Sequence, residues 1–365
     1  MPRTKNPFTP AFGSEPLFLV GREQIIEDIL GGLENDPGDP NRASILIGPR
    51  GSGKTVLLTK IAHEAAQIGW LAANVTVGPR MLDAILEQVE HNGKEFLPQK
   101  TKKRLSGISA FGAGLNVQHI EEQKPSWRLK MTQYLDILAE SQIGLLITVD
   151  EIDAKQQELV ELVSDFQHFI REKREVSLLM AGLPGKTLQM FQDKSISFVR
   201  RAFQHKLDAI DRSDVKTAIR KTVESSGRKI DKDALDAAAD YARGFPFLLQ
   251  LVGYHTWRQS PENKIITRAD VDQGIESSEG YMDRMILDTT VNELSDKDLA
   301  FLLAMLPDEA VSRMSDITQR MGINTQLAGQ YRLRLIRQGV IEEYGRGKVQ
   351  LTMPLMKNYL TKNYL

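Results

Sequence analysis

Apolar residues follow two different spacings along the first half of this chain. Four continuous apolar runs have the length of buried strands: ASILIG at 43–48, WLAANVTV at 70–77, GLLITVD at 144–150 and SLLMAG at 177–182. Segments with apolar residues every three or four positions predict helices over 22–33, 54–67, 81–90, 127–140 and 155–173. Because strands alternate with helices, the pattern predicts an α/β fold with a parallel sheet, ending in a short strand near HKLDAI at 205–210.

The regular alternation of predicted strands and helices is interrupted between residues 94 and 125. This segment holds the basic run KKR at 102–104 and the glycine-rich GISAFGAGLNV at 107–117. We interpret it as an insertion with hairpin character.

The second half changes to a helical pattern. Residues 211–278 contain helices that begin at Asp or Ser caps and end at glycine. Two further helices, VSRMSDITQRMG and NTQLAGQYRLRLIRQG, meet across a tight turn and precede two strand-like stretches joined by GRG. The order helix, turn, helix, strand pair predicts a winged helix. We therefore expect an arm over residues 1–20, a nucleotide domain over 21–210, a helical lid over 211–279 and a winged-helix domain over 280–365.

Composition narrows the class of protein. The 365 residues are 41% hydrophobic and 26% charged, and cysteine is absent, which excludes disulfides and thiolate metal sites. The start MPRTKNPFTP lacks the apolar core of a secretory signal, and no apolar run is long enough for a bilayer. These features predict a soluble cytoplasmic protein. Net charge is −1, yet residues 311–365 hold nine Lys and Arg against three Asp and Glu.

The strongest motif is GPRGSGKT, which fits the phosphate-binding loop G-x-x-x-x-G-K-[ST] at every fixed position. An apolar strand precedes it and a helix follows, as a phosphate-binding loop requires. We expect Lys54 to reach the β- and γ-phosphates of ATP and Thr55 to bind Mg²⁺. The predicted nucleotide-binding residues of the loop are Gly48, Pro49, Arg50, Gly51, Ser52, Gly53, Lys54 and Thr55.

An acid pair ends the apolar run LLITVD and supplies the second half of the site. Asp150 stands where it can hold the Mg²⁺ ion, and Glu151 where it can act as general base on an attacking water. We expect their strand to lie beside the strand of the phosphate loop. The alternative is that the two acids only begin the next helix, where acidic residues are favoured.

These motifs give the chain a family resemblance. LVGRE at 19–23, GPRGSGKT, VDEID and a helical segment with GFPF resemble AAA+-type ATPases, in particular origin-recognition-type initiators and STAND signalling ATPases. The whole chain is similar to a bacterial set of ATP-binding proteins with an NPF-x-P-x-FGS-x-P arm, a GRE box, AGLPG, Gly-x-Pro in the lid and a winged helix. The resemblance implies a P-loop NTPase fold and says little about the biological role.

Further site residues follow from this resemblance. It implies that the GRE box, with Leu19, Val20, Gly21 and Arg22, lies against the adenine and ribose. It also implies that Gly244, Phe245 and Pro246 of the lid lie over the nucleotide. The residues alone allow an alternative for each segment. The GRE box can be an ordinary helix start, and Gly244 can end one helix while Pro246 begins the next.

Two departures from the family pattern predict slow or partner-dependent hydrolysis. Ala181 and Gly182 stand where a polar sensor residue is usual, and Phe247 stands where an initiator-type lid carries arginine. Losing one preorganised group costs on the order of 10²-fold in rate. Arg200 and Arg201 precede the last strand, near the position of an arginine finger in ring ATPases, which makes Arg201 a candidate catalytic residue in a homo-oligomer. The alternative is two solvated arginines.

The basic C-terminal segment predicts a partner. In a winged helix the second helix enters the major groove of DNA and the wing lies on phosphate. The residues expected to face outward for this contact are Thr325, Gln326, Gln330, Arg334 and Arg337 on the helix, and Arg346 and Lys348 on the wing. The sequence thus predicts an ATP- and Mg²⁺-binding switch that contacts double-stranded DNA through residues 311–365. The alternative is a STAND-like ATPase whose winged helix docks a protein partner.

Overall fold

The computed structural model describes residues 5–11, 13–96, 126–193 and 196–365. Its first unit is built on five parallel strands in the order β2-β3-β4-β1-β5. The strands are β1 (Ala43–Ile47), β2 (Trp70–Thr76), β3 (Gly144–Asp150), β4 (Val176–Gly182) and β5 (Phe203–Lys206). Every residue of β4 is buried, because helices cover both faces of a parallel sheet.

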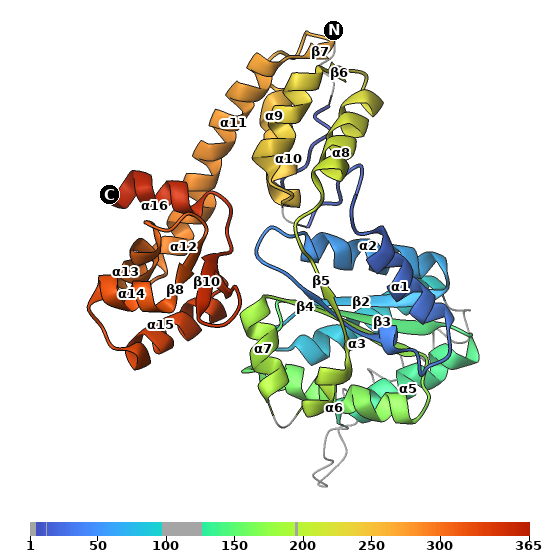
Figure 1. Ribbon diagram of the computed structural model, residues 1–365. Coiled ribbons are helices and arrows are strands. Elements are labelled where there is room, and N and C mark those ends of the chain that lie inside the picture. The colour runs from blue at the N-terminus through green and yellow to red at the C-terminus, as the bar shows by residue number, and fades with distance from the viewer. Residues whose placement is uncertain (1–4, 12, 97–125, 194–195) are drawn as a thin grey trace, which may run out of the picture.

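Helices pack on the two faces of this sheet (Figure 1). The face with α1 (Glu23–Glu34) and α2 (Lys54–Gln67) receives Leu46 and Leu146, and the opposite face receives Ile45 and Ile147. This split follows from the alternation of side chains along a strand. The opposite face is covered by α3 (Met81–Phe96), α5 (Trp127–Glu140), α6 (Gln157–Arg171) and α7 (Pro184–Gln192).

Most of the predicted elements are present. The helices over 54–67 and 127–140 and the strand over 144–150 begin and end where the sequence predicts. The last strand is wrong by a few residues, since β5 ends at Lys206, and helix α7 was not predicted at all. The KKR run and the predicted hairpin lie outside the described residues.

The predicted order of the two strands that carry the site is wrong in one respect. We expected the strand of Asp150 to lie beside the strand of the phosphate loop. Instead β4 pairs with both β1 and β3 and separates them. Sequence spacing cannot reveal this insertion, because β4 follows both strands in the chain.

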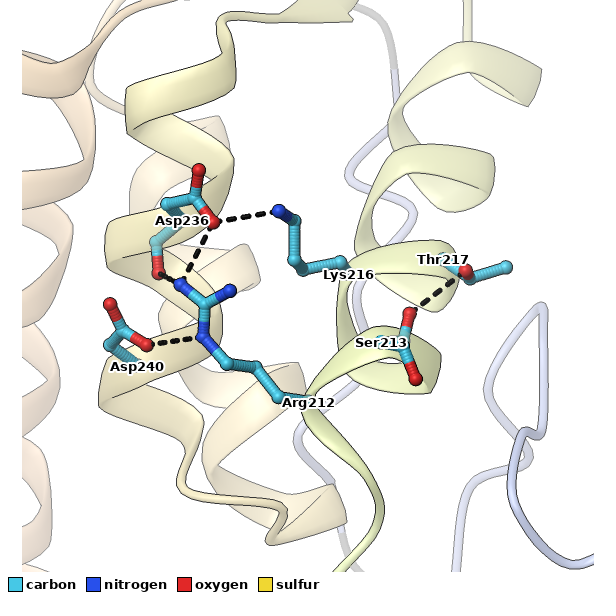
Figure 2. Close-up of polar contacts among 6 residues, drawn as sticks. All are labelled: Arg212, Ser213, Lys216, Thr217, Asp236 and Asp240. Carbon is cyan, nitrogen blue, oxygen red and sulfur yellow. Dashed lines mark hydrogen bonds and ion pairs between the residues drawn. The ribbon is translucent and has the colours of Figure 1, made fainter.

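A helical lid follows the sheet. It consists of α8 (Arg212–Ser225), α9 (Lys232–Ala242), α10 (Pro246–Trp257) and α11 (Arg268–Met282), with the two-residue strands β6 (Lys229–Ile230) and β7 (Ile265–Ile266) at its far end. Figure 2 shows how ion pairs join α8 to α9. Arg212 contacts Asp240 at 2.6 Å and Asp236 at 2.8 Å, and Lys216 contacts Asp236 at 2.7 Å. The hydrogen bonds that Arg212 donates to Asp240 and Asp236 raise the pKa of Arg212, so the arginine stays charged.

The predicted boundary between residues 279 and 280 does not coincide with a linker. Helix α11 continues through the π-helical turn η3 (Asp283–Leu287) into α12 (Asp288–Asn292) without a non-helical residue. Figure 1 shows this rod running from the lid to the C-terminal unit. Gly280 lies inside the rod, so here glycine does not end a helix as it does at Gly244.

The C-terminal unit has three antiparallel strands in the order β8-β10-β9. Its elements are α13 (Asp296–Met305), β8 (Val311–Arg313), α14 (Met314–Met321), α15 (Thr325–Arg337), β9 (Ile341–Glu343), β10 (Lys348–Leu351) and α16 (Met356–Tyr364). Ile317 and Leu335 join α14 and α15 in its core. Among the described helices, none combines the length and hydrophobicity needed to cross a membrane.

Candidate nucleotide site

The phosphate loop connects the end of β1 to the start of α2. Gly51 and Gly53 have φ of +79° and +88°, a left-handed conformation that glycine adopts without a steric penalty. Gly48 is restricted in another way, because a Cβ there would lie 2.5 Å from Ser52 Oγ. These glycines let the loop turn tightly at the N-terminus of α2. Backbone N–H groups at such a turn are the arrangement that binds phosphate.

Lys54 lies folded onto this loop. Its Nζ donates to the carbonyl oxygens of Gly48 and Pro49, both at 2.8 Å. Burial lowers the pKa of Lys54 to about 8, and the nearby carboxylate of Asp150 opposes that shift. The lysine thus carries a desolvated charge at the point where a phosphate would lie.

Thr55 and Asp150 meet although their strands are not neighbours. Thr55 Oγ1 donates to Asp150 Oδ2 at 2.5 Å. The contact forms because α2, which begins at Lys54, crosses the sheet and packs on β3 as well as β4. The two predicted metal ligands are therefore side by side.

This pair of oxygens suits Mg²⁺. The ion takes oxygen ligands in octahedral geometry, and it commonly uses one or two protein groups together with substrate phosphates and waters. Within the part of the chain that the structure describes, no cluster of three acidic or histidine side chains offers a complete metal cage. Thr55 and Asp150 would hold the ion, which would neutralise charge on the phosphates of the nucleotide.

Glu151 follows directly and is exposed. Its backbone is left-handed, with φ of +57°, which is uncommon for a residue other than glycine. Its N–H donates to Asp150 Oδ1 at 2.8 Å, whereas its carboxylate has no hydrogen bond to any described residue. The carboxylate is therefore free to accept a proton from water.

The lid touches the phosphate loop directly. Phe247 N donates to Gly51 O at 3.3 Å, and a Cβ on Gly53 would lie 3.6 Å from the Pro246 ring. Gly244, with φ of +75°, accepts a hydrogen bond from Ile210 N at 2.9 Å. The predicted lid segment thus lies on the loop, with Pro246 next to Gly53 and Phe247 next to Gly51.

The GRE box lies beside the start of the lid. Val20 is half-buried against the lid core, and Gly21 has φ of +68°. The buried guanidinium of Arg22 donates to Gly21 O at 3.1 Å and Asp208 O at 2.6 Å. Arg22 therefore ties the box to the segment before α8, and a contact of its side chain with the base stays a prediction.

The N-terminal arm joins the lid to the site, which the sequence alone did not indicate. Phe8 is 2% exposed, and a Cβ on Gly253 of α10 would lie 2.3 Å from its ring. Further along the arm, a Cβ on Gly13 would lie 3.6 Å from the Thr55 methyl group. The arm thus spans from α10 to the predicted metal ligand.

Close packing at the end of β4 accounts for the absence of a polar sensor side chain at residues 181 and 182. A Cβ on Gly182 would lie 2.4 Å from Ile152 Cγ1, and Ile152 N donates to Ala181 O at 3.0 Å. A buried isoleucine therefore fills the space of a polar side chain.

The two arginines before β5 differ. Arg200 Nε donates to Phe191 O. Arg201 is exposed and, within the described residues, has no hydrogen-bond or ion-pair partner. Arg201 is thus the more available of the two, at the edge of the sheet formed by β5.

One predicted DNA-contact residue has a partner within the protein. Arg334 is engaged by Asp298, a carboxylate whose side chain is 1% exposed. It therefore serves the core of the C-terminal unit, because a buried carboxylate requires a partner. Thr325, Gln326 and Gln330 are exposed, as expected, and Arg337 is exposed at the end of α15.

Comparisons with known proteins agree with this geometry. A family model described as an AAA domain matches residues 39–191, and one described as a domain of unknown function matches residues 284–360. No curated protein matches the chain in sequence. The structure is similar to a Walker-type ATPase of Pyrococcus abyssi, with 16% identity, a TM-score of 0.68, and coverage of 94% of this chain and 96% of that chain.

A second solved structure has a similar fold. Cdc6p from Pyrobaculum aerophilum is 16% identical with a TM-score of 0.52, over 97% of this chain and 96% of that chain. At such identity these likenesses show the fold. With the AAA domain match they confirm the predicted P-loop NTPase fold and a P-loop ATPase unit of the AAA type.

Proposed function

We propose that this protein binds ATP with Mg²⁺ and acts as a nucleotide-controlled, DNA-associated switch. The observation that carries the first part is the 2.5 Å contact between Thr55 Oγ1 and Asp150 Oδ2 beside the half-buried Lys54. The lid rests on the same loop through Phe247 N and Gly51 O. Phosphates that enter between loop and lid would change this contact, which gives the nucleotide a way to bias two arrangements.

Hydrolysis is proposed to be slow or stimulated by a partner. Glu151 is the proposed general base, since its carboxylate is exposed and adjacent to the metal ligand. No polar side chain at 181 or 182 would orient the γ-phosphate or its water, and Phe247 cannot replace an arginine. Arg201 is proposed to act on the nucleotide of a second copy in a homo-oligomer, which its exposure permits.

The proposed DNA surface is the strand side of the C-terminal unit, which we take to be a winged helix. Within residues 311–365, four basic residues form ion pairs with acidic side chains, namely Arg320, Arg332, Arg334 and Lys362. Arg313, Arg346 and Lys348 are exposed and have no ion pair among the described residues. Arg313 and Lys348 stand opposite each other in the β8–β10 register. Like charges in that position repel, so a bound phosphate would stabilise them.

The first experiment is steady-state ATP turnover at low salt, with and without duplex DNA, using Lys54→Ala as the blank. We expect turnover above the blank and an increase with DNA. DNA affinity should fall steeply with salt, because binding through phosphates releases counterions. Turnover equal to the blank would remove the ATPase from the proposal.

Charge reversal tests the surface. We expect Arg346→Glu with Lys348→Glu to weaken DNA binding by at least about tenfold, since each lost phosphate contact also lowers the salt dependence. The matched control is Arg220→Glu with Lys221→Glu, an exposed basic pair on α8 of the lid. Equal binding by both double variants would exclude the strand side as the DNA surface.

A specific observation supports the alternative of a docked protein partner. A groove of about 500 Å³ lies between α13, α14 and α15. Leu303, Met321, Leu327 and Tyr331 line it, so it would suit an apolar side chain of a partner. A partner in this groove would bind with little salt dependence, and Leu327→Asp would abolish that binding without affecting DNA.

A further inference from the structure

The turn between β4 and α7, residues 181–186, lies against the loop that carries the proposed base. Ile152, the residue after Glu151, donates its N–H to Ala181 O at 3.0 Å. A Cβ on Gly182 would overlap the Ile152 side chain at 2.4 Å. The turn and the loop that carries the proposed base are therefore packed too closely to move independently.

Lys186 adds an ion pair to this packing. Its Nζ contacts Asp153 Oδ2, and the two side chains are 30% and 22% exposed. Asp153 also accepts from Lys155 N at 3.1 Å. A lysine in the first turn of a helix is opposed by the helix dipole. Its position in α7 is thus explained by Asp153, two residues beyond Glu151.

The same turn touches the C-terminal unit from its other side. A Cβ on Gly185 would lie 2.3 Å from Ile336 O and 2.9 Å from Arg337 Cα. A Cβ on Gly339 would lie 2.9 Å from Leu183 Cδ1. The last turn of α15 therefore abuts the first turn of α7, and opposite ends of two helix dipoles meet (Figure 1).

The strained backbone of Glu151 connects these observations. A non-glycine residue at φ of +57° persists only when its surroundings hold it. Asp150 Oδ1, Ala181 O and the Lys186–Asp153 pair hold the loop around Glu151. Two of these three supports come from the turn that α15 contacts.

We propose that Lys186 is a positioning residue for Glu151, and that docking of α15 on the β4–α7 turn maintains this position. The C-terminal unit thereby controls the rate of hydrolysis through residues 181–186. The inference rests on the proposed ATPase function, whose catalytic loop it uses. It assigns a role to Lys186 and names residues 181–186 as the contact through which the C-terminal unit regulates that loop.

Kinetics of a double-mutant cycle test the role of Lys186. We expect Lys186→Ala to lower kcat at least about tenfold, with KM for ATP within about twofold, and Lys186→Arg to recover most of the rate. In a Glu151→Gln background, Lys186→Ala should cause no further loss, because residues that act through one group are not additive. A kcat within twofold of wild type, or an equal loss in both backgrounds, overturns the positioning role.

Distance measurements test the route. The chain has no cysteine, so spin labels can be placed at Leu188→Cys on α7 and Leu333→Cys on α15, both exposed. We expect Gly185→Ala, which inserts an atom, and Leu183→Ala, which deletes a contact, to lengthen the label distance and lower kcat. Gly329→Ala is the matched control, since a Cβ there on α15 meets nothing within 4 Å.

The outcomes separate the two proposals. A longer distance with unchanged kcat in both Gly185→Ala and Leu183→Ala overturns the route, and so does an unchanged distance in both. Wild-type turnover equal to that of Lys54→Ala would instead contradict the proposed ATPase and, with it, the positioning role. The label distance would still report whether α15 docks on the turn.

Discussion

Arg334 of α15 donates to both carboxylate oxygens of Asp298 on α13, over N–O distances of 2.7 to 2.9 Å. The Asp298 side chain is 1% exposed and also accepts from Ser295 Oγ at 2.7 Å. A charge in this position depends on its partner, because water cannot solvate it. A basic residue that the sequence predicts as a DNA contact thus also stabilises the packing between α13 and α15.

The first prediction follows from this pair. Arg334→Ala should lower the free energy of unfolding by about 2 kcal/mol, less than for a fully buried pair because Arg334 is itself 46% exposed. Arg346→Ala, which removes an exposed arginine without an ion pair to any described residue, should change it by less than about 0.5 kcal/mol. Urea unfolding of both variants measures this. Identical midpoints would show that Asp298 does not need Arg334.

The sequence could locate Arg334 on a helix but could not reveal its partner. Helical periodicity reports neighbours three or four residues away, whereas Asp298 is 36 residues upstream. The same limit explains the error in strand order, since β4 enters between β1 and β3 from later in the chain. The phosphate loop was predictable because its fixed residues are contiguous and its strand and helix flank it directly.

The second prediction separates nucleotide binding from hydrolysis. Glu151→Gln should lower ATP turnover by about 10²-fold or more, because an amide cannot accept the proton of the attacking water. Binding of ATP should stay within a few-fold of wild type, since the Glu151 carboxylate has no hydrogen bond to a described residue. Asp150→Asn should instead weaken binding in the presence of Mg²⁺.

Turnover assays and titration with a fluorescent ATP analogue, with and without Mg²⁺, measure these effects. Thr59→Ala is a control in α2, one turn beyond Thr55, where the hydroxyl only donates to a backbone carbonyl at 3.0 Å. Wild-type turnover by Glu151→Gln would assign the base role to another residue.

The third prediction concerns the N-terminal arm. Phe8→Ala should destabilise the protein by about 3 kcal/mol, since it removes a nearly fully buried ring from the lid core. Gly253→Ala should act in the same direction because its Cβ would overlap that ring at 2.3 Å. Leu17→Ala, which truncates an arm residue that is 56% exposed, should have little effect. Thermal unfolding of the three variants tests this order of stability.

The arm also shows where sequence analysis lacked a signal. Its Pro-, Phe- and Gly-rich composition was compatible with an extended segment, and it contained no periodicity that could identify Phe8 as core. The match between Phe8 and Gly253 depends on a helical glycine 245 residues away whose missing side chain makes the space. Lys186 was not predicted as a site residue for a related reason. Helix α7 begins at a Pro–Gly pair, and this local sequence is typical of a turn.

The last prediction uses pH. Arg320 donates to both oxygens of Asp308 at 2.7 Å, and this hydrogen bonding lowers the pKa of Asp308 to about 2. A carboxyl whose pKa is lower in the folded state stabilises the protein above its ordinary pKa and loses that contribution as pH falls through 2. From the ordinary value of 3.8, roughly half of the contribution should remain at pH 3.

Arg320→Gln should therefore lower the denaturant midpoint relative to wild type at pH 7, and the part of this difference that is due to the ion pair should shrink by about half at pH 3. A remainder independent of pH is expected, because Arg320 also donates to Ala304 O at 2.7 Å. Arg220→Gln, which replaces an exposed arginine of α8 that has no ion pair among the described residues, should show no difference at either pH. If the difference for Arg320→Gln were the same at both pH values, the arginine would stabilise α14 through the backbone carbonyl alone. The ion pair with Asp308 would then contribute nothing to folding.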